Sequence, residues 1–233
     1  MLRRLIILAI AVLSVGLLSA CGPNKSGDKE AQDQLLERLT EARAKIDKAE
    51  TINLTLSAKT LPDGLSGLMS ASGKGNHTPA FQGTVKVVTG GAAVSAEVFA
   101  ADGEVWAKPS FSPIPLKIDP ATLKAPDPAT LFEPTTGFSQ ILVETSGLKE
   151  TGKSRDGKDV LTTISGQISG GVVRAILPSA DTAASFTATY RLTDDNELRD
   201  ASISGPFYPD VADVTYDITL TTSTKPFTVT LPK

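Results

Sequence analysis

The sequence predicts an α+β fold in which one amphipathic helix precedes a single curved antiparallel sheet. Between residues 31 and 49, apolar side chains recur in steps of three and four, which is the period of a helix with one buried face. From Ile52 onward they alternate with polar side chains, which is the period of a half-buried strand. Glycine- and aspartate-containing turn pairs then separate further alternating segments, as hairpins require.

The N-terminus has the features of a bacterial lipoprotein signal peptide. Arg3 and Arg4 precede an apolar run over residues 5–18. This run has about 14 residues, whereas a permanent membrane span takes about 20. The segment Leu18-Ser19-Ala20-Cys21 places small residues before the only cysteine of the chain. We therefore expect cleavage after residue 20, lipidation of Cys21, and a protein anchored to the outer face of the cytoplasmic membrane.

Composition limits the classes of partner that the exported part can have. Removal of the signal peptide, residues 1–20, takes two arginines with it and leaves 213 residues with 21 basic and 26 acidic side chains, a net charge of −5. A mildly acidic chain without a Lys/Arg cluster argues against binding to nucleic acid. It also makes electrostatic attachment to anionic headgroups an unsuitable mechanism. We expect the protein to be attached to the cytoplasmic membrane through its lipid anchor.

The short segment that follows the cysteine separates the anchor from the domain. Residues 21–27 are polar and contain glycine, so they predict a flexible lipidated tether. Asp28 is a suitable N-cap for the helix. Residues 28–233 are then expected to form one domain, because this length suits a single β-rich unit.

Alternation predicts the strands that follow the helix. They lie at residues 52–58, 83–89, 93–100, 104–108, 158–167, 185–192, 197–204, 213–221 and 227–231. Hairpin turns are expected at Gly90-Gly91, Asp102-Gly103, Asp156-Gly157 and Asp194-Asp195-Asn196. Residues 127–142 and 169–177 interrupt this pattern and carry more apolar side chains than a free loop. We expect both to be helical or irregular segments that lie against one face of the sheet.

The residues that enzymes use for catalysis are sparse in this chain. His77 is the only histidine, and its surroundings, Gly-Lys-Gly-Asn-His-Thr-Pro, predict an exposed turn without a catalytic role. Because the chain has no second histidine and no free cysteine, we expect no histidine-rich or thiolate metal site. We also expect no cofactor. Carboxylate pairs are the remaining route to catalysis. Asp194, Asp195 and Glu197 are better explained by a turn, and Glu144 with Glu150 has no further support. We therefore expect a protein that is not an enzyme.

Taken in order, several segments resemble the actinobacterial lipoprotein family that includes LppX, LprA, LprF and LprG. They are INLTL at 52–56, GTVKVV at 83–88, DGEVWA at 102–107, DPATLFEPTTGF at 127–138 and VLTTISG at 160–166. The resemblance implies a U-shaped half-barrel with helices on its concave side and an apolar cavity between them. It also implies binding of multi-acyl lipids or glycolipids, transport of these lipids across the cell envelope, and possible cooperation with a lipid exporter.

The inward phase of each predicted strand supplies candidate wall residues for such a cavity. On the strands these are Leu54, Leu56, Val85, Val87, Val94, Val98, Phe186 and Ile218, and on the helical side Phe138, Ile141 and Leu142. A filled core would show the same alternation, so a non-enzymatic envelope interaction protein stays an alternative. A solute-binding receptor of an importer is the other, although such receptors usually have two α/β lobes.

Overall fold

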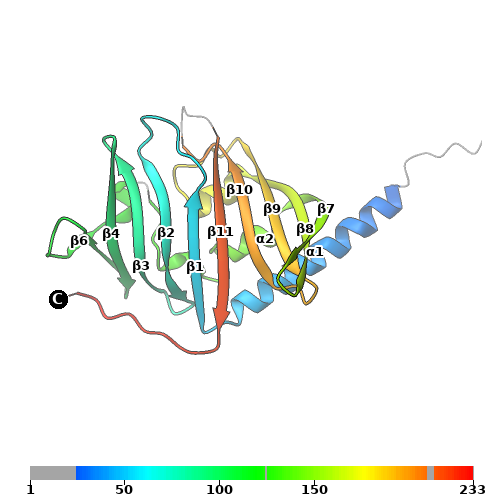
Figure 1. Cartoon of the computed structure of the whole chain (residues 1–233), viewed down its shortest axis with the longest axis horizontal. Coiled ribbons are helices and arrows are strands. Elements are labelled where there is room, and N and C mark those ends of the chain that lie inside the picture. The colour runs from blue at the N-terminus through cyan, green and yellow to red at the C-terminus, as the bar shows by residue number, and fades with distance from the viewer. Residues whose placement is uncertain (1–24, 124, 209–212, 233) are drawn as a thin grey trace, which may run out of the picture.

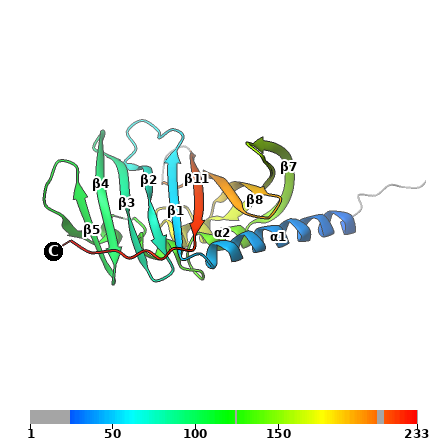
Figure 2. The same cartoon turned by 60° about the horizontal axis from the view of Figure 1, so that its bottom comes forward.

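The computed structural model describes residues 25–123, 125–208 and 213–232. The predicted signal peptide and Cys21 lie outside these ranges. Among the described residues, no helix is both long and apolar enough to cross a membrane. The described chain forms one open sheet with its helices on one side (Figures 1 and 2).

The sheet has eleven strands, and every neighbouring pair is antiparallel. Its order is β6-β5-β4-β3-β2-β1-β11-β10-β9-β8-β7, so β1 and β11 join the two halves and β6 and β7 are the edges. The strands are β1 (Thr51–Ala58), β2 (Gly67–Asn76), β3 (Ala80–Thr89), β4 (Ala92–Ala101), β5 (Glu104–Pro109), β6 (Leu116–Ile118), β7 (Ser146–Asp156), β8 (Asp159–Ser169), β9 (Ser185–Thr193), β10 (Leu198–Gly205) and β11 (Val214–Ser223). The sheet curves without closing, and β7 curls over at one edge (Figure 2).

The helical segments are α1 (Lys25–Asp47), α2 (Ser139–Val143) and α3 (Gly170–Ile176), with short 3-10 turns η1 (Pro120–Leu123) and η2 (Thr130–Phe132). Helix α1 contacts α2 and β7, whereas α3 lies on β8 and β9. The side chains of Leu35, Leu39 and Ile46 bury one stripe of α1. Burial of this stripe stabilises the helix because a fully buried leucine or isoleucine contributes about 1.5–3 kcal/mol. The α+β fold with helices on the concave side of a curved antiparallel sheet is thus confirmed.

Helix α1 differs from its prediction at its N-terminal end. It begins at Lys25, three residues before Asp28, so the last residues of the predicted tether, 25–27, are helical. Ala31, which the apolar period assigned to the buried face, is exposed. Figure 1 shows the reason, because this end of α1 projects beyond the sheet and has nothing to pack against.

Three strands, β2, β6 and β7, do not appear in the sequence prediction. Strand β2 is rich in glycine and serine, and its glycines are needed because aromatic rings lie on them. A Cβ at Gly73 would lie 2.6 Å from the Phe81 ring, and one at Gly75 would lie 2.1 Å from the Phe132 ring. Strand β7 is exposed at all residues except Leu148, so it carries no apolar alternation. It is held by backbone pairing to β8, which a hydrophobic period does not report.

The predicted strand at residues 227–231 is wrong, because this segment pairs with no strand of the sheet. It runs as an extended tail after β11 (Figure 2). Side chains hold it instead: Asn76 Nδ2 donates to the Phe227 carbonyl at 3.0 Å, and Thr51 Oγ1 donates to the Lys225 carbonyl at 2.7 Å. Pro226 and Pro232 bracket the segment and lack the backbone N–H that a ladder requires.

His77 does not lie in a freely exposed turn as the sequence predicts. Its ring is half-buried, with Nδ1 2.6 Å from the Phe132 carbonyl oxygen and Nε2 3.2 Å from the Ile46 carbonyl oxygen. These carbonyls belong to η2 and to the end of α1, so the imidazole joins both helical segments to the turn after β2. His77 therefore has a structural position between the helices and the sheet.

Both partners of the ring are carbonyl oxygens, and a neutral imidazole has one N–H to donate. We therefore expect His77→Ala to lower the free energy of unfolding by about 0.5–1.5 kcal/mol, the contribution of one intramolecular hydrogen bond. Urea titration of the purified protein measures this change. His77→Gln, which keeps an amide donor, is the control and should lose less. A His77→Ala protein as stable as the wild type would show that these two contacts contribute nothing.

Candidate functional site

The strand register identifies the residues that face the helices. One row runs directly across the sheet from β4 to β8 and consists of Ala96, Val85, Ala71, Leu56, Ile218, Ala201, Tyr190 and Ile164. At Tyr190 this row meets the helical side, because the Tyr190 hydroxyl lies 2.7 Å from Thr145 Oγ1, just after α2. The row therefore marks the concave face.

Burial along this row changes from one half of the sheet to the other. Ala201, Tyr190 and Ile164 are buried beneath the helical segments. On β1–β4 and β11 the row stays half-buried, as at Leu56 and Val85. The concave face thus carries an apolar surface that side chains fill over β8–β10 and leave partly open over β1–β4.

Aromatic side chains close the concave face at one end of the open half. Phe81 and Phe132 stack with ring centroids 6.3 Å apart, and Phe138 meets Phe132 edge-on at 5.6 Å. Gly73, Gly75 and Gly83 lie directly beneath the Phe81 and Phe132 rings, so that end is packed down to the backbone. Any ligand on the concave face must therefore lie away from this aromatic cluster.

The buried hydroxyls of the concave face have structural partners. Burial raises the pKa of Tyr190, whose hydroxyl pairs with Thr145. Burial also raises the pKa of Tyr216, whose hydroxyl donates to the Leu68 carbonyl oxygen at 2.7 Å. Leu68 N–H in turn donates to the Tyr208 hydroxyl at 2.9 Å. The Tyr216 and Tyr208 contacts with Leu68 fasten the start of β2 to β11 and to the segment before it.

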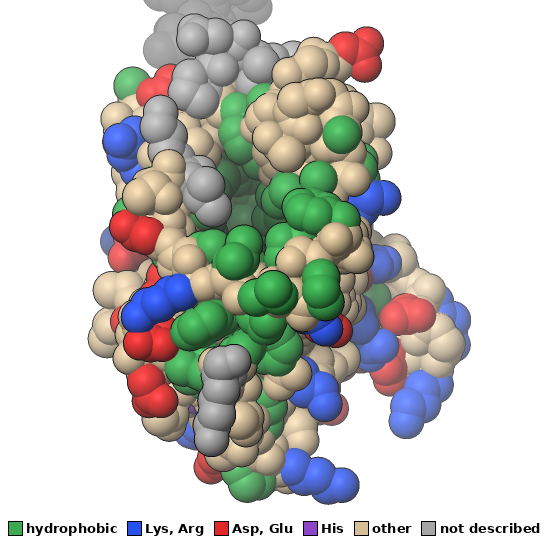
Figure 3. All heavy atoms as spheres, turned by 90° about the vertical axis from the view of Figure 1, so that its left-hand side faces the viewer, with side chains coloured by type: hydrophobic (Ala, Val, Ile, Leu, Met, Phe, Trp, Pro, Cys, Tyr) green, Lys and Arg blue, Asp and Glu red, His purple; other side chains and the backbone are tan. Residues whose placement is uncertain are grey.

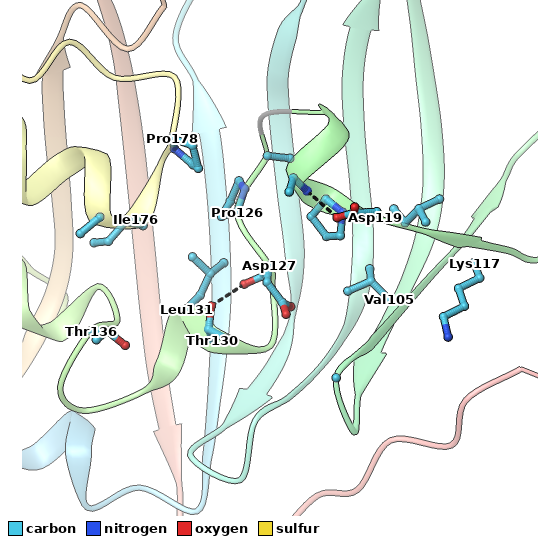
Figure 4. Close-up of a pocket in the computed structure, with 16 residues that line it drawn as sticks. Val105, Lys117, Asp119, Pro126, Asp127, Thr130, Leu131, Thr136, Ile176 and Pro178 are labelled. Atoms are coloured by element: carbon cyan, nitrogen blue, oxygen red, sulfur yellow. Dashed lines mark hydrogen bonds between the residues drawn. The ribbon is translucent and has the colours of Figure 1, made fainter.

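A cavity of about 500 Å³ lies between the β5–β6 end of the sheet and the end of α3. This volume falls within the roughly 300–1,000 Å³ typical of ligand sites. Its apolar lining comes mainly from Val105, Ile118, Pro126, Leu131, Ile176 and Pro178. Figure 4 shows how β5, β6, the segment around η2 and the end of α3 each contribute to this lining. Viewed from the β4–β6 end, the molecule is hollowed and hydrophobic side chains gather around the hollow (Figure 3).

The charged groups of the cavity wall are already engaged. Lys117 Nζ donates to Glu104 Oε1 at 2.6 Å, and this hydrogen bond lowers the pKa of Glu104. Asp119 Oδ1 accepts from the Ala121 N–H, and Asp127 Oδ1 accepts from the Ala129 N–H, as in Asx turns. Thr130 Oγ1 also donates to the Asp127 carbonyl oxygen (Figure 4). These contacts orient the three charged side chains along the wall and stabilise its loops.

The predicted wall residues lie on the concave face and beneath the helices, but none of them lines this cavity. Leu54, Val98, Ile141, Leu142 and Phe186 are buried in the core. Leu56, Val85, Phe138 and Ile218 are partly buried against that core. Val87 and Val94 are half-buried on the open half of the sheet. For all of these residues, contact with a ligand stays a prediction.

Apart from Gly103 and Val105, the residues that line the cavity come from segments for which the sequence predicted no strand. Residues 113–126 contain prolines and alanines between isolated apolar residues, so neither a helical nor a strand pattern marks them. The sequence signal that could have located these lining residues is the density of apolar side chains in an irregular segment. Within the ranges described, no three His, Cys, Asp or Glu side chains are placed to hold a metal ion.

Known proteins share both the sequence pattern and the fold. The model of the LppX_LprAFG lipoprotein family matches residues 32–229. The lipoarabinomannan carrier protein LprG of Mycobacterium tuberculosis is 27% identical over 206 residues, which cover 86% of this chain and 85% of that protein. The crystal structure of LprF from Mycobacterium bovis superposes with a TM-score of 0.69 at 16% identity, over 86% of this chain and 97% of that chain. That of Mycobacterium tuberculosis LppX gives 0.60 at 16% identity, over 85% and 99%. The chain belongs to the LppX_LprAFG lipoprotein family.

Proposed function

We propose that this protein is a lipid carrier, anchored through lipidated Cys21 to the extracytoplasmic face of the cell membrane. It binds an acylated lipid or glycolipid on its concave face and carries it across the cell envelope, with a lipid exporter as its possible source. It holds no cofactor and leaves the lipid chemically unchanged.

Two observations carry this proposal: the hollow at the β4–β6 end with its apolar cavity of about 500 Å³, and the half-buried apolar side chains of β1–β4 on the concave face. A filled β-domain would have no reason to leave Val85, Val87 and Leu56 partly open. An acyl chain gains about 0.8 kcal/mol for each methylene removed from water. An apolar hollow of this kind therefore suits a long acyl chain better than a polar solute.

The charges of the cavity wall indicate how such a ligand is oriented. Among the described residues of this wall, Lys117 is engaged by Glu104, and Asp119 and Asp127 each accept a backbone hydrogen bond, so these three charges serve the wall itself. We infer that the acyl chains enter the hollow and the polar headgroup stays outside. The carrier role of LprG supports a glycolipid as cargo.

We expect protein purified from its native envelope to retain lipid. Native mass spectrometry should show a mass excess that disappears after organic extraction, and the extract should contain an intact acylated lipid. Protein refolded from denaturant without lipid is the control for this excess.

Absence of lipid from the native preparation, together with no binding of added glycolipid by the refolded protein, would contradict the proposal. It would favour the alternative of an envelope interaction protein. The importer-receptor alternative is not supported by the fold, because all the strand pairs described are antiparallel.

A further inference from the structure

We propose that the β5–β6 loop, residues 110–116, inserts into the lipid bilayer that holds the anchor, giving the protein a second membrane contact beside its cavity. This inference rests on the lipid anchor of the proposed function. It concerns how the protein sits on its membrane and does not depend on which lipid it carries.

The three most exposed large hydrophobic side chains of the described residues belong to this loop. Phe111 is 77% exposed, Ile114 is 64% exposed and Leu116 is 54% exposed. These three side chains lie within six consecutive residues, 111–116, at one edge of the sheet. Large apolar side chains that cluster in this way on a monomer mark an interaction site, whereas scattered ones do not.

The backbone of the loop suits a lipid environment rather than a strand from another protein. Ser110 N–H donates to the Ser95 carbonyl at 2.8 Å, Ser112 N–H to the Pro109 carbonyl at 3.0 Å, and Ile114 N–H to Ser112 Oγ at 3.2 Å. Pro109, Pro113 and Pro115 have no N–H to satisfy. A segment that enters a bilayer must satisfy its backbone polar groups internally, whereas a partner strand needs them free.

The charged residues of the hairpin lie on either side of its apolar tip, as suits a segment that enters a membrane interface. Residues 105–118 contain two lysines and no carboxylate, and both lysines flank the apolar tip. Lys108 and Lys117 form ion pairs with Glu97 and Glu104 at the base of the hairpin. Long lysine stems allow an apolar tip to lie deeper than its charged base.

The loop is continuous with the cavity. Lys117 and Ile118 follow Leu116 directly and line the cavity wall. Insertion of the tip would therefore bring the β5–β6 end of the hollow to the bilayer surface. Lipid could then pass between membrane and cavity over a short path with little exposure to water.

The anchor identifies the membrane that the loop meets. Cys21 can lie at most about 14 Å from Lys25, the start of α1, because only three residues separate them. In Figure 1 the start of α1 and the β5–β6 loop lie at opposite ends of the molecule. A few apolar side chains bind a bilayer weakly by themselves, but an anchor on the same molecule raises their effective concentration at that bilayer. The protein would then lie with its long axis along the membrane surface.

The test uses the full chain reconstituted into phosphatidylcholine–phosphatidylglycerol vesicles. Cys21 is the only cysteine and is acylated in the lipoprotein, so Ser112→Cys supplies a single free thiol for an environment-sensitive fluorophore. Ser154→Cys, on the exposed face of β7 at the other edge of the sheet, is the matched control. We expect a blue-shifted emission and quenching by doxyl-labelled lipids at position 112, and neither at position 154. Phe111→Asp with Ile114→Asp should abolish the quenching at 112.

Each other outcome has a defined meaning. If the protein floats with the vesicles but position 112 is quenched no more than position 154, loop insertion is wrong and the carrier proposal stands. A blue shift at 112 without doxyl quenching would show that the loop packs against protein, its own chain or a second copy, and would overturn insertion into the bilayer. A protein that fails to float would overturn the anchor and with it the two-point attachment.

Discussion

Replacement of Val85 by tryptophan is expected to lower lipid occupancy by about tenfold or more with little loss of stability. Val85 is half-buried on the open half of the concave face, and its neighbours across β2 and β4 are Ala71 and Ala96. An indole that displaces two methylenes of ligand removes about 1.6 kcal/mol of binding, which is already about tenfold. Native mass spectrometry measures occupancy, and urea titration measures stability.

The matched control is Lys86→Trp on the same strand. Lys86 is exposed and lies next to Val85 on the strand, out of phase with it, so its side chain points to the convex face. We expect normal lipid occupancy in this variant. Val87→Trp, in the same phase as Val85, should behave like Val85→Trp.

The two stability results separate an open face from a solid core. Overpacking a filled core typically costs 1–3 kcal/mol. If Val85→Trp lost that much stability and the wild type held no lipid, the concave face would be a core and the carrier proposal would fail. If Lys86→Trp blocked lipid while the valine variants did not, the ligand would lie on the convex face.

The Cys21→Ala change is expected to abolish lipidation completely. Cys21 is the only cysteine of the chain and stands directly after Leu18-Ser19-Ala20, so no other thiol is available for the diacylglycerol. Two acyl chains hold a protein on a membrane far more firmly than one. Metabolic labelling with a fatty-acid analogue should therefore mark the wild type and leave the variant unlabelled.

The control for the anchor is Ser26→Ala, which changes a nearby residue and keeps the cysteine. It should be labelled and remain in the membrane fraction. Label retained by the Cys21→Ala protein would refute the assignment of the anchor. An unlabelled Cys21→Ala protein that stayed on the membrane would indicate that the uncut apolar segment, residues 5–18, holds it.

Local patterns in the sequence predicted most of the sheet. Alternation located β1, β3–β5 and β8–β11, because each of these strands has one face against the core. Turn pairs located the hairpins, since Asp102 and Gly103 adopt positive φ angles of 54° and 74°. The same phase placed Val85 and Lys86 on opposite faces of β3. In these elements the sequence of a single strand is enough to show which of its faces lies toward the core.

Other features depend on residues far apart in the chain. The glycines of β2 are needed because the Phe81 and Phe132 rings rest on them, and no pattern within β2 predicts those rings. His77 became a bridge between α1 and η2 only when the fold brought Ile46 and Phe132 to its ring. The cavity forms between β5 and irregular segments around residues 117–136 and 175–178, which only the fold brings together.

By itself, the sequence determined the α+β class, the antiparallel sheet and the phase of its main strands, together with the pattern that predicts an anchor at Cys21. Those properties depend on local spacing and on short motifs. The tertiary structure alone decided which inward residues are buried in the core, such as Leu54 and Phe186, and which stay partly open, such as Val85. Alternation shows which face of a strand is turned away from water. A cavity depends on something else, namely whether another element fills the space opposite that face.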